Sequence, residues 1–409
     1  MTLELPSARL PSLTEMVAAA DRHAWTNAFI CTIFAVTGPI AIILTVATAG
    51  GLPKTVVDNW IFAAFFVGGV LTVLCSLFYR QPLALAWTMP GSALLITALD
   101  HLSFPEAVGA FLVSGVFMVL LGVSGFVARL MAAIPVGVAM AMVAGVFLSF
   151  GIELITGFRD SPILSGAMVG AFLVCTAVPA IRRVVPPLLG ALIAGAVAAA
   201  ALGQAPTIPL DSDWIARPSF VTPVFSIPAL LELVVPLIIS VLAVQNLQGF
   251  TVLREAGHPA PISALTVACG YGTLAMGILG SVPTCVTGPA NAFLVSSGRR
   301  EYQYMGGILF GLMFAGIGLL APLVTQAATT MPRVFITALG GLAMLPVLIN
   351  AFQAAFGNAR AGGTAALGPL VSFIVTVSGI NLFNVGAPFW GLVFGFAVHV
   401  GLDRRRGSN

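Results

Sequence analysis

The chain is a succession of long apolar segments separated by short polar ones. Most of them approach the roughly 20 apolar residues that a helix needs to cross a bilayer. The pattern predicts spans at 24–48, 60–79, 83–99, 104–128, 131–150, 163–181 and 186–203, and then at 228–250, 260–279, 281–298, 302–327, 331–354, 365–382 and 385–403. We therefore expect an all-α polytopic membrane protein with about 14 spans.

The same pattern divides the chain into five parts. Residues 1–23 are expected to form a cytoplasmic N-terminal segment and 404–409 a basic cytoplasmic tail. Between them, 24–203 and 228–403 form two seven-span repeats, joined by the extracytoplasmic linker 204–227. Because seven is an odd number, the second repeat must insert upside down relative to the first. Such inverted repeats are typical of secondary transporters, in which one part of the protein moves against another around a fixed site.

Composition agrees with a membrane protein and excludes several other classes. The chain is 59% hydrophobic and 8% charged, with a mean hydropathy of +1.06, whereas soluble domains carry roughly 25% charged residues. The five cysteines lie in apolar runs without a CxxC pair, which favours buried thiols over disulfides or metal ligands. The sequence contains no nucleophile–base pair and no metal-ligand motif. We expect neither an enzyme nor a cofactor, and no nucleic-acid partner.

Basic residues are distributed unevenly between the two sides of the predicted spans. Of the 17 Lys and Arg residues, four fall on one side: Lys54, Arg159, Arg217 and Arg333. Loops that are rich in Lys and Arg remain in the cytoplasm. The bias therefore places both termini in the cytoplasm, in a multi-pass protein of the inner (plasma) membrane.

Two spans are interrupted at their centres by reversed dipeptides, Pro90-Gly91 and Gly288-Pro289. Proline cannot continue a helix but suits the first turn of a new one. Each span should therefore be a short extended stretch followed by a half-helix, with the two stretches paired as a small antiparallel ladder. Non-helical backbone at membrane depth persists only when it is buried in protein or lines a cavity. The alternative interpretation is that these residues merely kink two ordinary helices.

The half-helices would begin near the midplane of the membrane. A helix N-terminus offers free N–H groups and a partial positive charge, which together favour an anion. We expect the small residues there to let a ligand approach closely, and Ser92 and Asn291 to add hydrogen-bonding side chains. The residues predicted at this site are Thr88, Pro90, Gly91 and Ser92 in the first broken span, and Thr287, Gly288, Pro289, Ala290 and Asn291 in the second.

Further candidates stand near the two breaks. The amides of Gln245 and Asn246 are costly in a membrane helix unless they face a polar cavity or a neighbouring helix. We interpret them as lining the substrate site, with helix–helix hydrogen bonding as the alternative. Phe34 and Thr37 are grouped with them, because they occupy the corresponding weak point of the first span. Trp87 precedes the first break and could form either an aromatic wall for a planar ligand or ordinary packing.

Acidic and basic residues are missing from the middle of the predicted spans. Proton-coupled carriers usually place their relay on such a residue. Three routes for a proton stay open: Glu232, Asp100 together with His101, or the carboxylate of the substrate itself. His399, within the last span, is interpreted as packing.

Around these residues the chain resembles the benzoate:proton symporter (BenE) family. The resemblance covers roughly residues 25–403. The matching stretches are Pro82 through Leu95, Gln245-Asn246 with Gly249, Ser378-Gly379, and Ala387-Pro388-Phe389-Trp390-Gly391-Leu392. The chain departs from the family at Phe34–Ile40, which lacks the expected serine-rich stretch, and at Gly288–Asn291, which is more polar than expected. Both departures concern the pocket and bear on the substrate more than on the fold.

The resemblance implies the fold of the uracil-permease and anion-exchanger group, with a core domain and a gate domain. It also implies a secondary active transporter that imports benzoate or a similar aromatic monocarboxylate with a proton by alternating access. The expected partners are that carboxylate, a proton and the lipid bilayer, with a homodimer as one possible assembly. A nucleobase:proton permease and an anion exchanger of the same fold are the nearest alternatives. A channel or a non-transporting scaffold is the alternative from a different class.

Overall fold

The structure is a computed structural model, and it describes most of the chain. The described residues are 3–7, 9–37, 39–127, 129, 135–182, 185–204, 214–296, 298–357, 366–380, 382 and 386–403. The predicted tail 404–409 and most of the first half of the predicted linker therefore lie outside the described residues. All five cysteines are buried and free of disulfides, which confirms the expectation of buried thiols.

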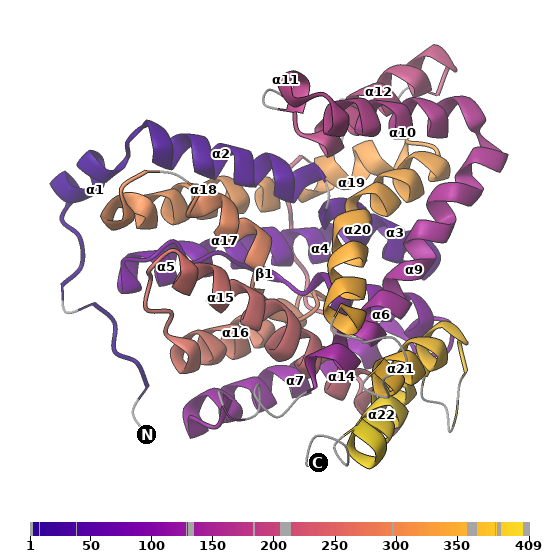
Figure 1. Cartoon of the computed structure of the whole chain (residues 1–409). Coiled ribbons are helices and arrows are strands. Elements are labelled where there is room, and N and C mark those ends of the chain that lie inside the picture. The colour runs from indigo at the N-terminus through magenta and orange to yellow at the C-terminus, as the bar shows by residue number, and fades with distance from the viewer. Residues whose placement is uncertain are drawn as a thin grey trace.

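The described chain is almost entirely helical, as the apolar pattern predicted (Figure 1). The first half contains α1 (Leu13–Ala19), α2 (Arg22–Thr37), α3 (Pro39–Ala49), α4 (Lys54–Phe62), η1 (Ala63–Val67), α5 (Gly68–Tyr79), β1 (Leu85–Trp87), α6 (Met89–Ala98), α7 (Phe104–Ser124), α9 (Val136–Asp160), α10 (Pro162–Ala177), α11 (Pro179–Arg182) and α12 (Pro187–Ala201). The second half contains α13 (Ile227–Ala229), η2 (Leu230–Val234), α14 (Val235–Ile239), η3 (Ser240–Asn246), α15 (Leu247–Glu255), α16 (Ile262–Gly277), β2 (Thr284–Val286), α17 (Gly288–Leu294), η4 (Arg300–Tyr302), α18 (Gln303–Leu319), α19 (Ala321–Thr329), α20 (Arg333–Phe356), α21 (Leu367–Val377), α22 (Ala387–Val398) and η6 (His399–Asp403).

Many of these helices are long and apolar enough to cross a membrane. Within the described residues, seven helical segments reach at least 18 residues with high mean hydropathy, and six shorter apolar helices accompany them. The half-helix α17 is shorter still. The multi-pass helical fold is confirmed, and the exact number of 14 spans stays a prediction.

The two broken spans meet through their extended stretches, as expected. β1 pairs with β2 in an antiparallel ladder in which Leu85 lies opposite Val286 and Trp87 lies opposite Thr284. The ladder continues beyond the strands, where the Thr88 N–H donates to Pro283 O over 2.9 Å. Backbone that would otherwise be unpaired inside a membrane is satisfied in this way.

The two repeats support their strands with equivalent threonines. In the first repeat, Thr72 Oγ1 accepts from the Leu85 N–H at 2.9 Å. In the second, Thr273 Oγ1 accepts from the Thr284 N–H at 2.9 Å. Leu85 stands five residues before Pro90, and Thr284 stands five residues before Pro289. The same contact therefore recurs at the same position of each repeat.

Glycines lie at the crossings of two helix pairs that the inverted repeat relates, α5 with α18 and α7 with α16. A Cβ added to Gly69 in α5 would lie 2.5 Å from the carbonyl oxygen of Gly311 in α18. In the related pair, a Cβ on Gly115 in α7 would lie 3.1 Å from the carbonyl oxygen of Gly270 in α16. Small residues at such crossings let membrane helices approach closely. Both crossings therefore depend on glycine, as expected for an inverted repeat.

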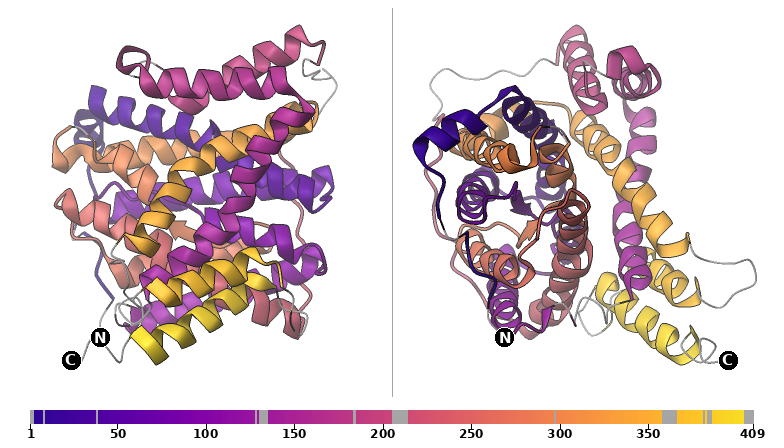
Figure 2. Two further views of the ribbon diagram at one scale, coloured as in Figure 1. Left: turned by 45° about the vertical axis from the view of Figure 1, so that its right-hand side comes forward. Right: turned by 60° about the vertical axis from the view of Figure 1, so that its left-hand side comes forward.

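The helices form two domains, a core domain and a gate domain, which the right-hand view of Figure 2 shows side by side. The core domain holds both broken spans together with α2–α5, α7 and α13–α19. The gate domain consists of α9, α10 and α12 from the first repeat and α20, α21 and α22 from the second. Within the gate domain, α9 packs on α20, α10 on α12 and α21 on α22. Each domain therefore combines elements from both repeats.

Candidate substrate-binding cavity

A large cavity, the main cavity, lies between the core and gate domains and has a volume of about 580 Å³. This volume falls within the range of about 300–1,000 Å³ that is usual for small-molecule sites. Its core wall comes from α2, α3, α6, η3, α15 and α17, and its gate wall from α9, α12 and α20. The lining residues are Phe34, Pro39, Met89, Pro90, Val136, Met140, Val143, Leu188, Ala243, Val244, Gln245, Leu247, Gln248, Pro289, Ala292, Phe293, Ala343, Met344, Pro346, Val347, Asn350 and Ala354.

The wall of this cavity is apolar apart from three amide side chains. These belong to Gln245 and Gln248 in the core and to Asn350 in the gate. Among the lining residues none is charged. A wall of this kind suits a ligand with an apolar body and a small polar group, because each amide can offer a hydrogen-bond donor or an acceptor.

Of the three lining amides, Gln245 is the most buried. Its side chain is 3% exposed, and its Nε2 has no hydrogen-bond partner. A buried donor without a partner costs about 1–3 kcal/mol, so such a donor is usually matched by a water molecule or a ligand. Gln245 lies in the π-helical segment η3, and π-helical turns occur frequently at functional sites. The placement agrees with the expectation that Gln245 faces a cavity.

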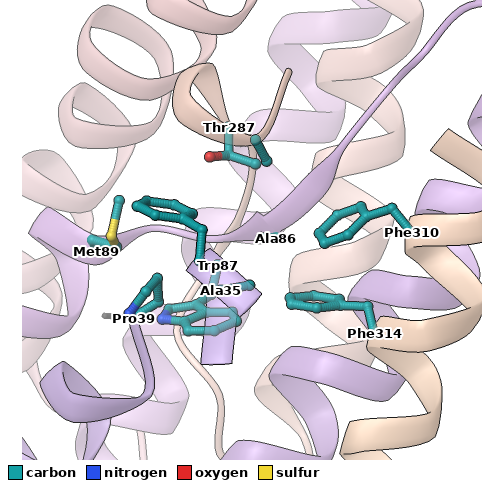
Figure 3. Close-up of a pocket in the computed structure, with 10 residues that line it drawn as sticks. Ala35, Pro39, Ala86, Trp87, Met89, Thr287, Phe310 and Phe314 are labelled. Atoms are coloured by element: carbon teal, nitrogen blue, oxygen red, sulfur yellow. The ribbon is translucent and has the colours of Figure 1, made fainter. Parts of the chain in front are cut away.

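A small aromatic chamber adjoins the main cavity (Figure 3). It shares Phe34, Pro39 and Met89 with the main cavity, and its volume of about 20 Å³ has room for about one water molecule. Its remaining lining residues are Ala35, Ala86, Trp87, Thr287, Ala290, Phe310 and Phe314. An aromatic ring would enter it only if a neighbouring side chain such as Met89 rotated away.

Trp87 forms one side of the aromatic chamber. Its indole lies nearly parallel to the ring of Phe314, with 5.9 Å between centroids and 14° between planes. Its Nε1 is buried without a hydrogen-bond partner. The ring is therefore packed, while its donor is unused. Both interpretations of Trp87 from the sequence, packing and aromatic wall, describe part of what the structure contains.

The N-terminus of α6 differs from the expected anion site. Thr88 caps the helix, because its Oγ1 accepts from the Gly91 N–H at 3.2 Å and its carbonyl oxygen accepts from the Ser92 N–H at 2.9 Å. Ser92 Oγ also donates to Thr88 O, and Pro90 has no N–H. Gly91 and Ser92 therefore do not present free donors to a ligand.

Protein side chains lie against the glycines at the breaks, and close approach of a ligand there stays a prediction. A Cβ on Gly91 would lie 2.8 Å from Leu237 Cδ2. A Cβ on Gly288 would lie 2.4 Å from Gln248 Cγ. Pro90 and Pro289 do line the main cavity, and Thr287 and Ala290 line the aromatic chamber.

Asn246 and Asn291 hold the extended stretches and do not line either cavity. Asn246 Oδ1 accepts from the Val286 N–H at 2.7 Å, and Asn291 Oδ1 accepts from the Ala84 N–H at 2.8 Å. Both side chains are fully buried. Each amide oxygen therefore satisfies backbone that the broken span leaves unpaired. The Nδ2 of each has no hydrogen-bond partner, and contact with substrate stays a prediction.

Two of the three residues considered for a proton come together. Glu232 Oε2 lies 2.8 Å from His101 Nε2, and the Glu232 side chain is 3% exposed. Asp100, beside His101, is exposed. None of the three lines the main cavity or the aromatic chamber. The side chain of Thr37, another candidate, lies outside the part of the chain that the structure describes.

Some cavity residues were not predicted. Asn350 is an isolated amide in an apolar span and could have been found by the argument used for Gln245. Phe310 and Phe314 lack such a signal, because phenylalanines four residues apart in an apolar helix are usually packing. Their position beside Trp87 depends on how α18 crosses the broken spans.

Comparisons with known proteins agree with this architecture. The profile of the family described as "Benzoate membrane transport protein" (BenE) matches residues 19–400. The chain is 31% identical over 378 residues to "Inner membrane protein YdcO" of Escherichia coli (strain K12), covering 92% of this chain and 94% of the relative. It is 27% identical over 385 residues to "Benzoate membrane transport protein" of Acinetobacter baylyi, covering 93% and 95%.

Solved structures share the fold at low sequence identity. The transmembrane domain of a cyanobacterial bicarbonate transporter, BicA, superposes with a TM-score of 0.63 at 15% identity, covering 91% of this chain and 97% of that chain. The murine anion transporter Slc26a9 in the inward-facing state gives a TM-score of 0.64 at 12% identity, covering 98% and 73%. These likenesses establish the fold, and the family match establishes kinship over nearly the whole chain. The chain is a multi-pass inner-membrane transport protein, and it belongs to the BenE family of benzoate membrane transport proteins.

Proposed function

We propose that the protein is a secondary active transporter that imports benzoate or a similar aromatic monocarboxylate together with a proton. The observation that carries this proposal is the uncharged cavity between the two domains, with the unpartnered amide of Gln245 on its wall. The description of the family and the name of the Acinetobacter relative support the same substrate class.

The substrate would use both parts of the site. Its ring would lie against Phe34 and Met89, at the entrance to the aromatic chamber. Its carboxylate would accept a hydrogen bond from Gln245 Nε2, with Trp87 Nε1 as a second donor once the chamber opens. Hydrogen bonds to a charged partner are worth about 1.5–3 kcal/mol. Two neutral donors would thus hold the carboxylate without a fixed positive charge.

The position of the cavity supports an inward-facing conformation. It extends from the broken spans to helix ends that adjoin the predicted cytoplasmic loops, represented by Val136, Leu188, Gln248 and Ala354. Movement of the core against the gate domain would close this side and open the other. Alternating access of this kind follows from the exchange of conformations between inverted repeats.

The proton would bind at a place in the protein that is remote from the substrate. Since none of the lining residues is charged, the closest candidate is the buried pair of Glu232 and His101. Asp100 is exposed and less suitable. Transfer on the carboxyl group of the substrate is the competing route. A homodimer stays a prediction.

The alternatives differ in what the cavity must recognise. A nucleobase permease would need groups that pair with a pyrimidine or purine edge, and a carrier of small inorganic anions would gain little from the aromatic chamber. A thermal-shift competition on the purified protein distinguishes them, with benzoate, uracil, xanthine and bicarbonate as ligands. We expect stabilisation by benzoate, reduced in Gln245→Ala. Stabilisation by uracil or bicarbonate, and none by any aromatic acid, would contradict the proposed substrate.

A further inference from the structure

We propose that Glu232 is the outer gate: its carboxylate joins the core domain to Gly386, the N-cap residue of α22 in the gate domain, and a proton arriving from outside releases it. The inference rests on the proposed function, since it names the step at which a proton would act in transport. It concerns a place in the protein that is remote from the substrate cavity.

Glu232 is an unusual residue among those the structure describes. No other Asp, Glu, Lys or Arg there is buried to the same degree. Taking a carboxylate out of water costs several kcal/mol unless hydrogen bonds and a partner compensate for it. A buried carboxylate in a membrane helix is therefore a functional candidate by default.

The carboxylate has partners in both domains. Its Oε2 lies 2.8 Å from His101 Nε2, in the core loop that follows α6. It also accepts a hydrogen bond from the backbone N–H of Gly386, the residue that precedes α22. A Cβ added to Gly386 would lie 2.4 Å from Glu232 Oε1. Only glycine lets the backbone of the gate domain approach the carboxylate this closely.

The link lies at the end of the transport path opposite to the cavity. Glu232 is near the beginning of the helical segment Ile227–Glu255, whereas Gln248 lines the cavity near its end. At about 1.5 Å per residue, the 16 positions between them correspond to roughly 24 Å. The carboxylate therefore closes the outer side while the inner side is hollow, as a gate must in an inward-facing carrier.

The charged groups around the carboxylate are few. His101 is its direct partner, Asp100 is adjacent in the same loop, and Glu106 faces this loop from the first turn of α7. α6, α14 and α22, which pack nearby, contribute no charged side chain. No Lys or Arg forms an ion pair with Glu232 among the described residues. Protonation of Glu232 therefore replaces two charge-assisted hydrogen bonds with neutral ones, which are about half as strong.

Two substitutions test separately the protonation of Glu232 and its contact with Gly386. Glu232→Gln keeps an acceptor for the Gly386 N–H but cannot bind or release a proton. Gly386→Ala forces the carboxylate away and changes no titratable group. Gly170→Ala is the matched control, because a Cβ at Gly170 in the gate helix α10 would meet nothing within 4 Å.

The readout is labelling of a reporter, Ala387→Cys, by a membrane-impermeant maleimide applied from outside. Ala387 is buried beside Gly386, and the parent chain, whose own cysteines are buried, provides the background. Because a maleimide reacts with the thiolate, whose fraction falls as the pH falls, the labelling rate is expressed relative to that of the same reporter in SDS-unfolded protein at the same pH. We expect this relative rate to be several-fold higher at pH 5.5 than at pH 8, because a weakened gate opens more often. Glu232→Gln should make the rate independent of pH, Gly386→Ala should make it fast throughout, and Gly170→Ala should behave like the parent.

A relative labelling rate that does not change with pH in the parent would overturn the gate, as would unchanged pH dependence of that rate in Glu232→Gln. If Gly386→Ala does not fold, the comparison of the parent with Glu232→Gln decides the question alone. The assay needs neither substrate nor transport. Failure of the gate is therefore distinguishable from failure of the proposed function, which the uptake of an aromatic acid tests.

Discussion

The side-chain oxygen of Asn291 in α17 accepts a hydrogen bond from the backbone N–H of Ala84, just before β1, over 2.8 Å. Residues far apart in the sequence, one in each repeat, are thereby joined at the centre of the core domain. The contact explains how two interrupted helices persist in a membrane. Backbone donors that the interruption releases are taken up by side chains of the other repeat or of a neighbouring helix.

Asn291→Ala should destabilise the protein, because it leaves the Ala84 N–H buried without a partner. The cost of such a donor is about 1–3 kcal/mol, which should lower the melting temperature in detergent. Asn350→Ala is the control, since that amide lines the cavity and is exposed. Equal melting temperatures for the two variants would show that the Asn291 contact contributes nothing to stability.

Gln245→Leu should weaken substrate binding without destabilising the protein. Removing an unpartnered buried amide leaves the melting temperature unchanged or raises it, while the carboxylate of the substrate loses its donor. A hydrogen bond to a charged group of about 1.5–3 kcal/mol corresponds to a roughly 10- to 100-fold weaker affinity. Titration of benzoate by isothermal calorimetry measures the change. Wild-type affinity in Gln245→Leu would remove this residue from the site.

Trp87→Phe tests whether the indole donor is used separately from the aromatic surface. The substitution keeps a ring against Phe314 and removes Nε1–H. We expect several-fold weaker binding of benzoate with little change in stability, whereas Trp87→Ala should lower both. If Trp87→Phe binds benzoate as the parent does, the indole serves packing alone.

His258, in the loop between α15 and α16, predicts a pH dependence of stability. Burial lowers the pKa of His258 below its ordinary value of 6.5, and the positive charge of Arg300 acts in the same direction, although the hydrogen bond to Gln303 opposes both. The folded protein therefore binds this proton more weakly than the unfolded chain does. Protonation favours unfolding, so stability present above about pH 6.5 is lost as the pH falls below it.

The measurement is the melting temperature between pH 8 and pH 5, compared with His258→Gln. We expect the variant to lose less stability than the parent on acidification, because one of the groups that protonate on unfolding is gone. Parallel curves for the two proteins would show that His258 does not contribute to the acid sensitivity.

Local chemistry in the sequence was sufficient to predict the broken spans. Pro90 and Pro289 cannot continue a helix, and that restriction alone predicts an extended stretch, a half-helix and a pairing of the two stretches. Gln245 could likewise be assigned to a cavity, since an amide in a membrane helix needs a polar environment.

Other roles depend on tertiary contacts that no local pattern encodes. Asn291 and Asn246 are amides in apolar spans, as Gln245 is. Their side-chain oxygens nevertheless accept hydrogen bonds from the backbone of a neighbouring span. The free donors expected at Gly91 and Ser92 are used by Thr88, which the sequence did not distinguish from a ligand contact. The link of Glu232 to Gly386 joins two domains, so it could be seen only after both were placed.

Uptake of labelled benzoate into proteoliposomes tests whether the protein couples the transport of an aromatic acid to a proton. Because benzoic acid crosses lipid unaided, initial rates at alkaline pH are corrected with protein-free vesicles and with Gln245→Leu. We expect saturable uptake that is several-fold faster when the outside is more acidic than the lumen, and that falls when an uncoupler removes the gradient. Uptake that is independent of the proton gradient, or none above the protein-free rate for any aromatic acid, would contradict this expectation.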